Sequence, residues 1–230
     1  MAKIKNLSTS TKWLIAPLLV GCVFLISGCE SKQSSAIKIE DQVVSNTGSA
    51  DDKAVVDAFL KGKEAEVQKL SKQFSSYFTS DFSIDTSNAA TTNGTTIPTL
   101  NYGGKPLNRD HSLPDRLTAQ NPGAVATIFV KSGDDFIRIS TSVKRSKQSD
   151  GGAVEEDDRA INSTLGNQHH AYSAILAGNS YMGTANLFGN IYMTEYTPIK
   201  DAKGTVIGIR FVGTDITNDI DMLKIKLGKS

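Results

Sequence analysis

Cysteine is almost absent from this chain, and what there is lies close to the front. Among 230 residues only Cys22 and Cys29 are cysteines, so residues 30–230 hold none. A disulfide framework is therefore excluded from the rest of the chain. A domain in that region has to be stabilised by burial of apolar side chains, and its length is sufficient for one hydrophobic core.

The recurrent motifs of catalysis and of nucleic-acid binding are absent as well. The chain has no glycine-rich phosphate loop, no GxSxG sequence and no HExxH sequence. Its formal net charge is only +1, and no basic block alternates with aromatic residues. These absences argue against an enzyme and against a nucleic-acid partner, and they point to no cofactor.

Metal ligands at a usual spacing are missing too. His111 and the pair His169–His170 have no cysteine or further histidine at ligand spacing. The acidic run at 155–158 lacks the Asp-x-Asp-x-Asp-Gly pattern that places oxygen atoms around one calcium ion. The sequence therefore predicts no metal site.

Only one long apolar run is present, at residues 13–27. It contains Pro17 and is shorter than the ~20 residues of a membrane-spanning helix. Basic residues before it and small residues after it are typical of a secretory signal. The sequence Ile-Ser-Gly-Cys at 26–29 resembles the lipobox of bacterial lipoproteins, which implies cleavage after residue 28 and lipidation of Cys29. An uncleaved anchor is the alternative, and both place residues 30–230 outside the cytoplasm.

A polar, Ser-rich stretch follows at 29–51, and we interpret it as a flexible tether. Apolar residues then recur at helical spacing, which predicts one long helix over 52–82. One stripe of this helix can face a sheet and another a second copy, so a homodimer through 52–82 is a hypothesis. On this hypothesis, Lys or Glu at Val67 weakens a dimer without unfolding the domain.

The remainder alternates short helices with strands. Residues 85–98 are expected to form a loop with a turn at Asn93-Gly94. Short helical patterns occupy "LPDRLTAQ" and "HHAYSAILAG". Strand patterns occupy "TIPTLNY", "KPLN", "AVATIFVK", "FIRISTSV", "SYMGTANLF", "NIYMTEYTPIK" and "TVIGIRFVGTDIT". This order predicts an α+β domain.

The segments "GDDFIRIST", "HHAYSAILAG", "SYMGTANLFGNIYMTEY" and "VIGIRFVGTDIT" resemble, in this order, the Cache 3/Cache 2 fusion type of extracytoplasmic sensor domain. That type forms the outer part of many bacterial chemotaxis receptors, and the resemblance spans about residues 52–220. It implies a PAS-like fold, in which a long N-terminal helix packs on a five- or six-stranded antiparallel sheet. The opposite face would form a pocket for a small ligand. Two departures, Gly166 for Asp and His170 for Pro, fall near its mouth.

Alternation along "FIRISTSV" selects the residues of this pocket. Ile137 and Ile139 would face the helix, whereas Phe136, Arg138 and Ser140 would face the other way. An arginine there is either a carboxylate clamp, since its planar fork holds carboxylate through two hydrogen bonds, or a solvated edge residue. The resemblance favours the clamp, and hence a carboxylate or amino acid as ligand.

Further pocket residues come from the later strands. Tyr192 and Thr194 share a face of their strand with Tyr196, as Tyr181 does with Gly183, and tyrosines suit a pocket wall. A half-exposed tyrosine stripe is the alternative. The resemblance implies that Asp215 binds the amine of a ligand, but its carboxylate could equally cap residues 216–220. His169 is either structural or a ligand contact. The candidate site is thus Arg138, Ser140, His169, Tyr181, Tyr192, Thr194 and Asp215.

These inferences give a domain order of signal peptide 1–28, lipid-anchored tether 29–51, sensor domain 52–220 and tail 221–230. The chain is expected to lie in the cell envelope, to bind a small ligand and to act through a separate signalling partner, because no signalling module follows. The alternatives are a structural envelope lipoprotein with a degenerate pocket and a truncated chemotaxis receptor.

Overall fold

The computed structural model describes residues 49–92, 94–145 and 158–228. The signal peptide, Cys29 and the tether up to residue 48 lie outside these ranges, as do Asn93 and most of the acidic run at 155–158. None of the helices in the described ranges combines the length and the apolar character that a membrane span requires.

The long helix α2 spans Ala50–Ser76. Ser49 and Asp52 form a capping box at its start, in which each side chain accepts a hydrogen bond from the backbone N–H of the other residue. The helix ends six residues before the predicted end at 82. The helical spacing predicted too long a helix because Phe78, which follows the end of α2, still packs on Phe74, with ring centroids 5.2 Å apart.

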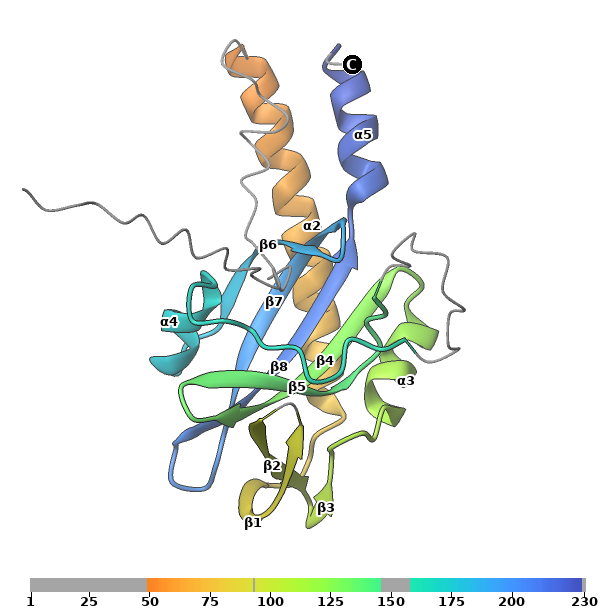
Figure 1. The fold of residues 1–230 in the computed structure, drawn as a ribbon. Coiled ribbons are helices and arrows are strands. Elements are labelled where there is room, and N and C mark those ends of the chain that lie inside the picture. Colours follow the sequence, from red (N-terminus) through yellow and green to blue (C-terminus); the bar gives the residue numbers. More distant parts are fainter. Residues whose placement is uncertain (1–48, 93, 146–157, 229–230) are drawn as a thin grey trace, which may run out of the picture. The chain divides into compact units, whose positions relative to one another are not determined.

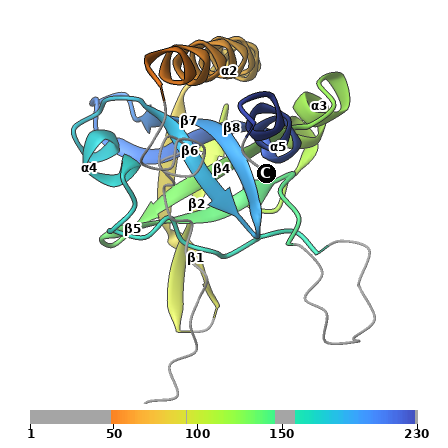
Figure 2. The same cartoon turned by 90° about the horizontal axis from the view of Figure 1, so that it is seen from above.

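The central sheet has five antiparallel strands in the order β5-β4-β8-β7-β6. This confirms the α+β, PAS-like fold with a long helix on an antiparallel sheet. The strands are β4 (Ala124–Ser132), β5 (Asp135–Thr141), β6 (Tyr181–Leu187), β7 (Asn190–Lys200) and β8 (Val206–Asp215). Figure 1 shows α2 crossing the sheet, and Figure 2 shows α2 as a separate layer beside it.

Each face of the central sheet has its own apolar core. One core joins Val67 and Phe74 of α2 to Ile128, Ile137 and other side chains of one face. The other lies on the opposite face, beneath the short helix α4 (Ala171–Leu176). Val67 is fully buried in the first core. The prediction that Lys or Glu at Val67 spares the fold is therefore wrong, because a charge there would be buried without a partner.

A second, smaller sheet consists of β1 (Phe82–Thr92), β2 (Thr95–Tyr102) and β3 (Lys105–Pro106). The prediction of a loop over 85–98 is wrong, since β1 and β2 occupy most of it. β1 gave no strand signal because its residues are largely exposed and a register shift between Asp85 and Ala90 breaks its alternation. The predicted strands around Gly103-Gly104 are confirmed. The small sheet packs on the α2 side of the central sheet, where the Leu100 side chain of β2 lies 3.4 Å from the position that a Cβ on Gly208 would take.

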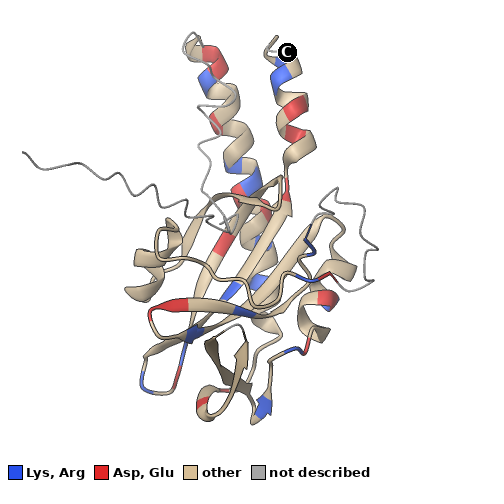
Figure 3. Ribbon diagram, in the orientation of Figure 1, with Lys and Arg blue, Asp and Glu red and all other residues tan. Residues whose placement is uncertain are grey.

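Two further helices complete the described chain, α3 (Ser112–Gln120) and α5 (Thr217–Lys226). The expected boundary between domain and tail at residue 220 falls inside α5. The N-terminal end of α2 and the C-terminal end of α5 lie at the same end of the domain (Figure 1). Both helices carry residues of both charge signs (Figure 3), and Lys63 of α2 pairs with Asp219 of α5 at 2.8 Å.

Candidate functional site

The face of the central sheet opposite α2 brings most of the predicted site residues together. Antiparallel partners share a face, so the cross-strand pairs fix the arrangement. The pairs that define this face are Phe129 with Arg138, Tyr192 with Asp215, Thr194 with Gly213, Tyr196 with Phe211, and Tyr181 with Tyr196. Arg138, Tyr181, Tyr192, Thr194 and Asp215 therefore lie on one surface, drawn from β5, β6, β7 and β8, with β4 between β5 and β8.

Arg138 is the buried cation of this face, with 5% of its surface exposed. Its guanidinium stacks 4.9 Å above the Phe129 ring and contacts the Ser163 hydroxyl and the Ala160 carbonyl. Its Nε has no hydrogen-bond partner, and within the described ranges no carboxylate lies at ion-pair distance. Burial lowers the Arg138 pKa to about 10. The arginine is thus dehydrated and lacks an anionic partner there.

A cover segment, residues 158–166, encloses Arg138 from the open edge of β5. Its backbone runs along β5, with Arg138 N–H donating to Ser163 O and Asn162 N–H donating to Arg138 O, both at 2.9 Å. Ser163 then turns its hydroxyl onto the guanidinium. No motif in the sequence shows this contact, because the segment is irregular and follows a charged stretch.

His169 closes the other end of the same face against two tyrosines. Its ring centroid lies 5.0 Å from Tyr196 and 6.5 Å from Tyr181, and its Nε2 is 3.3 Å from the Tyr196 hydroxyl. Its Nδ1 accepts from Ala171 N–H at 3.1 Å at the start of α4. Burial, with a smaller contribution from the neighbouring His170, lowers the His169 pKa to about 4. His169 thus joins the start of α4 to Tyr196 of β7.

Ser140 does not join this face. A register shift in the β4–β5 pair leaves Ile139 unpaired, so that Ser140 lies opposite Ile128 of the α2 side. Its hydroxyl donates to the Asp110 carbonyl, in the loop before α3. The predicted alternation therefore holds up to Arg138 and is wrong for Ser140, because one extra residue turns the following side chain to the opposite face.

Asp215 stands at the end of β8, where the strand passes into α5. Its carboxylate accepts a hydrogen bond from Thr217 N–H at 2.9 Å, as expected of a residue that satisfies the first turn of the following helix. It also lies close to Tyr192, whose pKa is raised by burial first and by the Asp215 charge second. The Thr194 hydroxyl, in contrast, donates a hydrogen bond to the Gly183 carbonyl at 2.7 Å.

The glycine that departs from the family pattern lies at the end of the cover segment. Gly166 adopts φ +87°, a left-handed conformation that favours glycine, and its N–H donates to Asp135 at 3.0 Å. The arrangement places the buried Arg138 cation, tyrosine hydroxyls and the Asp215 carboxylate on a single face. These groups can bind and orient a small polar molecule. In the described part of the chain, no group of three or more His, Cys, Asp or Glu side chains could hold a metal ion.

A family model described as the Cache 3/Cache 2 fusion domain matches residues 30–230. No curated protein and no solved structure matches the chain.

Proposed function

The chain belongs to the Cache 3/Cache 2 fusion domain family of extracytoplasmic sensor domains, and on that premise we propose that it senses a small carboxylate held by Arg138. Domains of this family bind small molecules rather than catalyse reactions. The observation that carries the proposal is the buried Arg138 guanidinium, which has an unpaired Nε and no acidic partner in the described ranges.

A buried cation without an anion is unfavourable, and this determines what Arg138 can do. Removing a charge from water costs several kcal/mol on an order-of-magnitude scale unless hydrogen bonds and an opposite charge compensate. Ser163 and Ala160 offer neutral oxygens only. A ligand carboxylate would supply the missing charge and an acceptor for Nε, and the fork of a guanidinium matches its two oxygens.

Asp215 lies too far along the sheet to share a small ligand with Arg138. Arg138 is in register with Phe129 and Ile209, whereas Asp215 follows Ile209 by six residues, which is roughly 20 Å of strand. A carboxylate, or the carboxylate end of an amino acid, would therefore use Arg138 and the tyrosines of this face. Asp215 would keep its hydrogen bond with Thr217 at the start of α5.

A degenerate pocket is the second candidate function, and the packing of this face supports it. Phe129, Phe211 and Tyr196 are almost fully buried on the Arg138 side, and the Phe211 and Tyr196 rings lie 4.8 Å apart. A protein whose own rings fill this face would serve as a structural envelope lipoprotein and would bind no ligand there.

The route from the site to a partner would run through α5. β8 ends at Asp215, and the Asp215 carboxylate holds Thr217 N–H at the start of α5. A ligand that displaces β8 would change this bond and shift α5 relative to α2, to which α5 is joined by the ion pair of Lys63 and Asp219. We propose that a separate signalling protein responds to this end of the domain.

Anchoring and self-association complete the proposal. Cleavage after residue 28 and lipidation of Cys29 would hold the domain at the membrane through the predicted tether, 29–51, of which residues 50 and 51 belong to α2. A homodimer would form through the exposed face of α2, which carries Ala58, Gly62 and Ala65, because Val67 faces the core. We also propose that the domain takes part in chemotaxis.

A thermal-shift screen of the full chain against amino acids, dicarboxylates, amines and purines tests the proposed function. At about 100 times the dissociation constant, a ligand adds ~2.7 kcal/mol to folding stability, which raises the melting point by about 5–10 °C for a domain of this size. Arg138→Ala should lose most of this rise and bind about tenfold to a hundredfold more weakly. Arg116→Ala, which removes an exposed arginine, is the matched control.

The outcomes separate the candidates. If no compound shifts the wild-type melt, the structural role is favoured. If a carboxylate binds Arg138→Ala as tightly as wild type, the clamp is wrong, and a pocket formed by Asp215 and the tyrosines would favour amines.

A further inference from the structure

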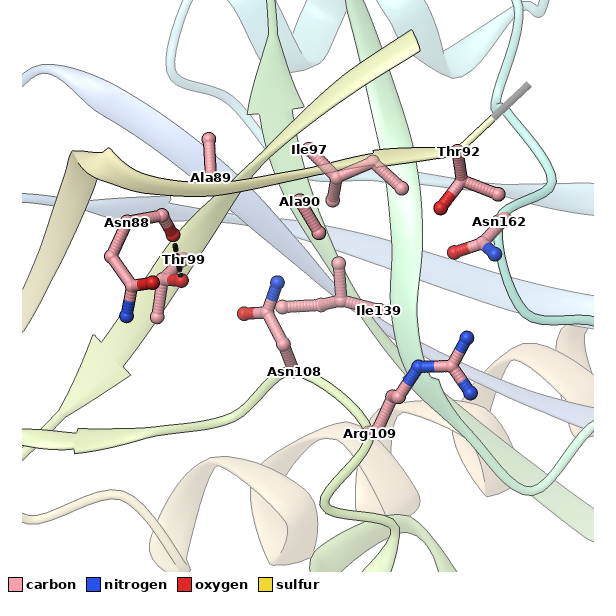
Figure 4. A pocket seen from close by; sticks show the side chains of 10 residues that line it. All are labelled: Asn88, Ala89, Ala90, Thr92, Ile97, Thr99, Asn108, Arg109, Ile139 and Asn162. Atoms are coloured by element: carbon pink, nitrogen blue, oxygen red, sulfur yellow. Dashed lines mark hydrogen bonds between the residues drawn. The ribbon is translucent and has the colours of Figure 1, made fainter. Parts of the chain in front are cut away.

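A cavity lies away from the Arg138 face, between the small sheet and β5. Its volume is about 240 Å³, below the ~300–1,000 Å³ of sites for drug-sized ligands. Ile97 of β2 and Ile139 of β5 line it with apolar surface, and Ala90 of β1 points between them (Figure 4). Ile97 and Ile139 belong to the α2-side core, whereas Arg138 faces the opposite side of the sheet. The two sites are therefore distinct.

The polar end of this cavity carries one positive charge. Arg109 is exposed and lies with Asn162 on the same side of Ile139 (Figure 4). Within the described ranges the Arg109 guanidinium makes no ion pair and no hydrogen bond, and the same holds for the Asn162 side-chain amide. The side-chain amide of Asn108, which also lines the cavity, already hydrogen-bonds to backbone groups of β2: it accepts from Leu100 N–H and donates to the Pro98 carbonyl. None of the described residues that line the cavity is acidic.

The backbone holds both polar residues in an unusual conformation. Arg109 and Asn162 each adopt φ +63°, in the left-handed region that non-glycine residues rarely occupy. Among the described residues, the third such non-glycine residue is Phe188, in the turn before Gly189. Backbone N–H groups of Arg109 and Asn162 donate to the carbonyls of Ile139 and Arg138, at 2.8 and 2.9 Å. Strained backbone of this kind tends to occur at ligand-binding sites.

We propose that this cavity binds a short-chain aliphatic monocarboxylate. The Arg109 fork would hold the carboxylate, with the Asn162 amide as a further donor. The aliphatic chain would lie on Ile97, Ile139 and Ala90. A dicarboxylate would bury a second charge without a cation, and an amino acid would place its ammonium group in a cavity whose lining has no acid. The class of ligand therefore follows from one cation beside a lining that is about half apolar and that includes no acid among the described residues.

Titration of butyrate into the full chain, followed by calorimetry, tests this inference. Arg109→Gln should weaken butyrate binding about tenfold or more, because it removes a charge-assisted hydrogen bond. Ala90→Leu should abolish it by filling the cavity. Two substitutions that leave the lining intact are matched controls: Lys105→Gln removes an exposed charge on β3, and Thr91→Leu enlarges a neighbouring side chain that points to the other side of β1. Both should bind as wild type.

The Arg138→Ala variant separates this inference from the proposed function. It should keep the butyrate site, since that site does not include Arg138. The inference is overturned if wild type shows no saturable binding of butyrate at millimolar concentration, or if Arg109→Gln binds as wild type. Loss of butyrate binding in Arg138→Ala alone also overturns it, and would assign butyrate to the Arg138 face. A cooperative thermal melt verifies that each variant is folded. If Ala90→Leu does not fold, the result with Arg109→Gln decides the test.

Discussion

Two arginines on opposite sides of β5 differ in how far their side chains are buried. Arg138 is 5% exposed, lies on a phenylalanine ring and has an unpaired Nε, whereas Arg109 is exposed at the mouth of a small cavity. Arg138 has already lost its water, so an anion that reaches it relieves a cost that the folded domain bears without ligand. Arg109 keeps its water, so binding there depends on the shape and the apolar side chains of the cavity.

The backbone joins the two sites through a short path. Asn162, which lines the Arg109 cavity, is followed directly by Ser163, whose hydroxyl contacts Arg138. On β5, the unpaired Ile139 lines the cavity and its carbonyl holds Arg109 N–H, while Arg138 precedes it. Ordinary strand alternation therefore turns the neighbouring residues Arg138 and Ile139 toward two different sites.

The largest expected difference between the two regions is in their response to acid. The His169 pKa is about 4 in the folded domain, below its ordinary 6.5, because burial disfavours the charged ring. The unfolded chain therefore binds the proton more readily between pH 6.5 and 4, and stability falls as the pH is lowered through this window. At ~1.4 kcal/mol per pKa unit, the loss is on the order of 3 kcal/mol.

Thermal melts between pH 7.5 and 4 measure this effect. His169→Asn should flatten the pH dependence, because its amide oxygen can still accept from Ala171 N–H but takes up no proton. Equal pH dependences of variant and wild type would mean that His169 does not titrate in this way. Arg109→Gln, on the other side of the sheet, is the control and should retain the wild-type slope.

Removal of the buried charge comes next in size. Arg138→Met should leave the ligand-free domain as stable as wild type or raise its stability by ~1 kcal/mol, since an apolar side chain of similar length needs no counter-ion. That gain corresponds to about 2–4 °C in melting point. Calorimetric melts without ligand provide the measurement. A lower melting point by several degrees would show that the contacts with Ser163 and Phe129 outweigh the cost of burying the charge.

The smallest effect is expected at the exposed arginine. Arg109→Met removes a hydrated charge that makes no ion pair in the described ranges, so the free energy of unfolding should change by less than ~0.5 kcal/mol. The same melts, compared with those of Arg138→Met, measure the contrast between the two residues. A large loss of stability in Arg109→Met would indicate that its guanidinium supports the fold and would remove the contrast.

The sequence predicted those parts of the molecule in which side chains follow a simple period. Alternation placed Ile137 and Arg138 on opposite faces of β5 correctly, and helical spacing found α2. Alternation failed at Ser140, because no local pattern marks an unpaired residue in a strand. β1 was missed because a largely exposed strand has no apolar face to reveal it.

Residues on irregular segments could not be found by any period. Ser163 reaches Arg138 because the cover segment runs along the edge of β5, and this pairing joins residues far apart in the chain. Arg109 stands in a turn before α3, where its environment depends on the small sheet. Both sites thus combine predictable strand positions with partners that only tertiary packing supplies.

The signal of the Arg138 Nε–H group in a nitrogen-15 correlation spectrum tests the central claim most directly. The full chain should be recorded without ligand and then saturated with the carboxylate that gives the largest melting rise. We expect the Arg138 Nε–H signal to shift and to become protected from solvent exchange, because the ligand supplies the acceptor that this nitrogen lacks. An unchanged Arg138 signal at saturation would contradict the claim that Arg138 binds the ligand.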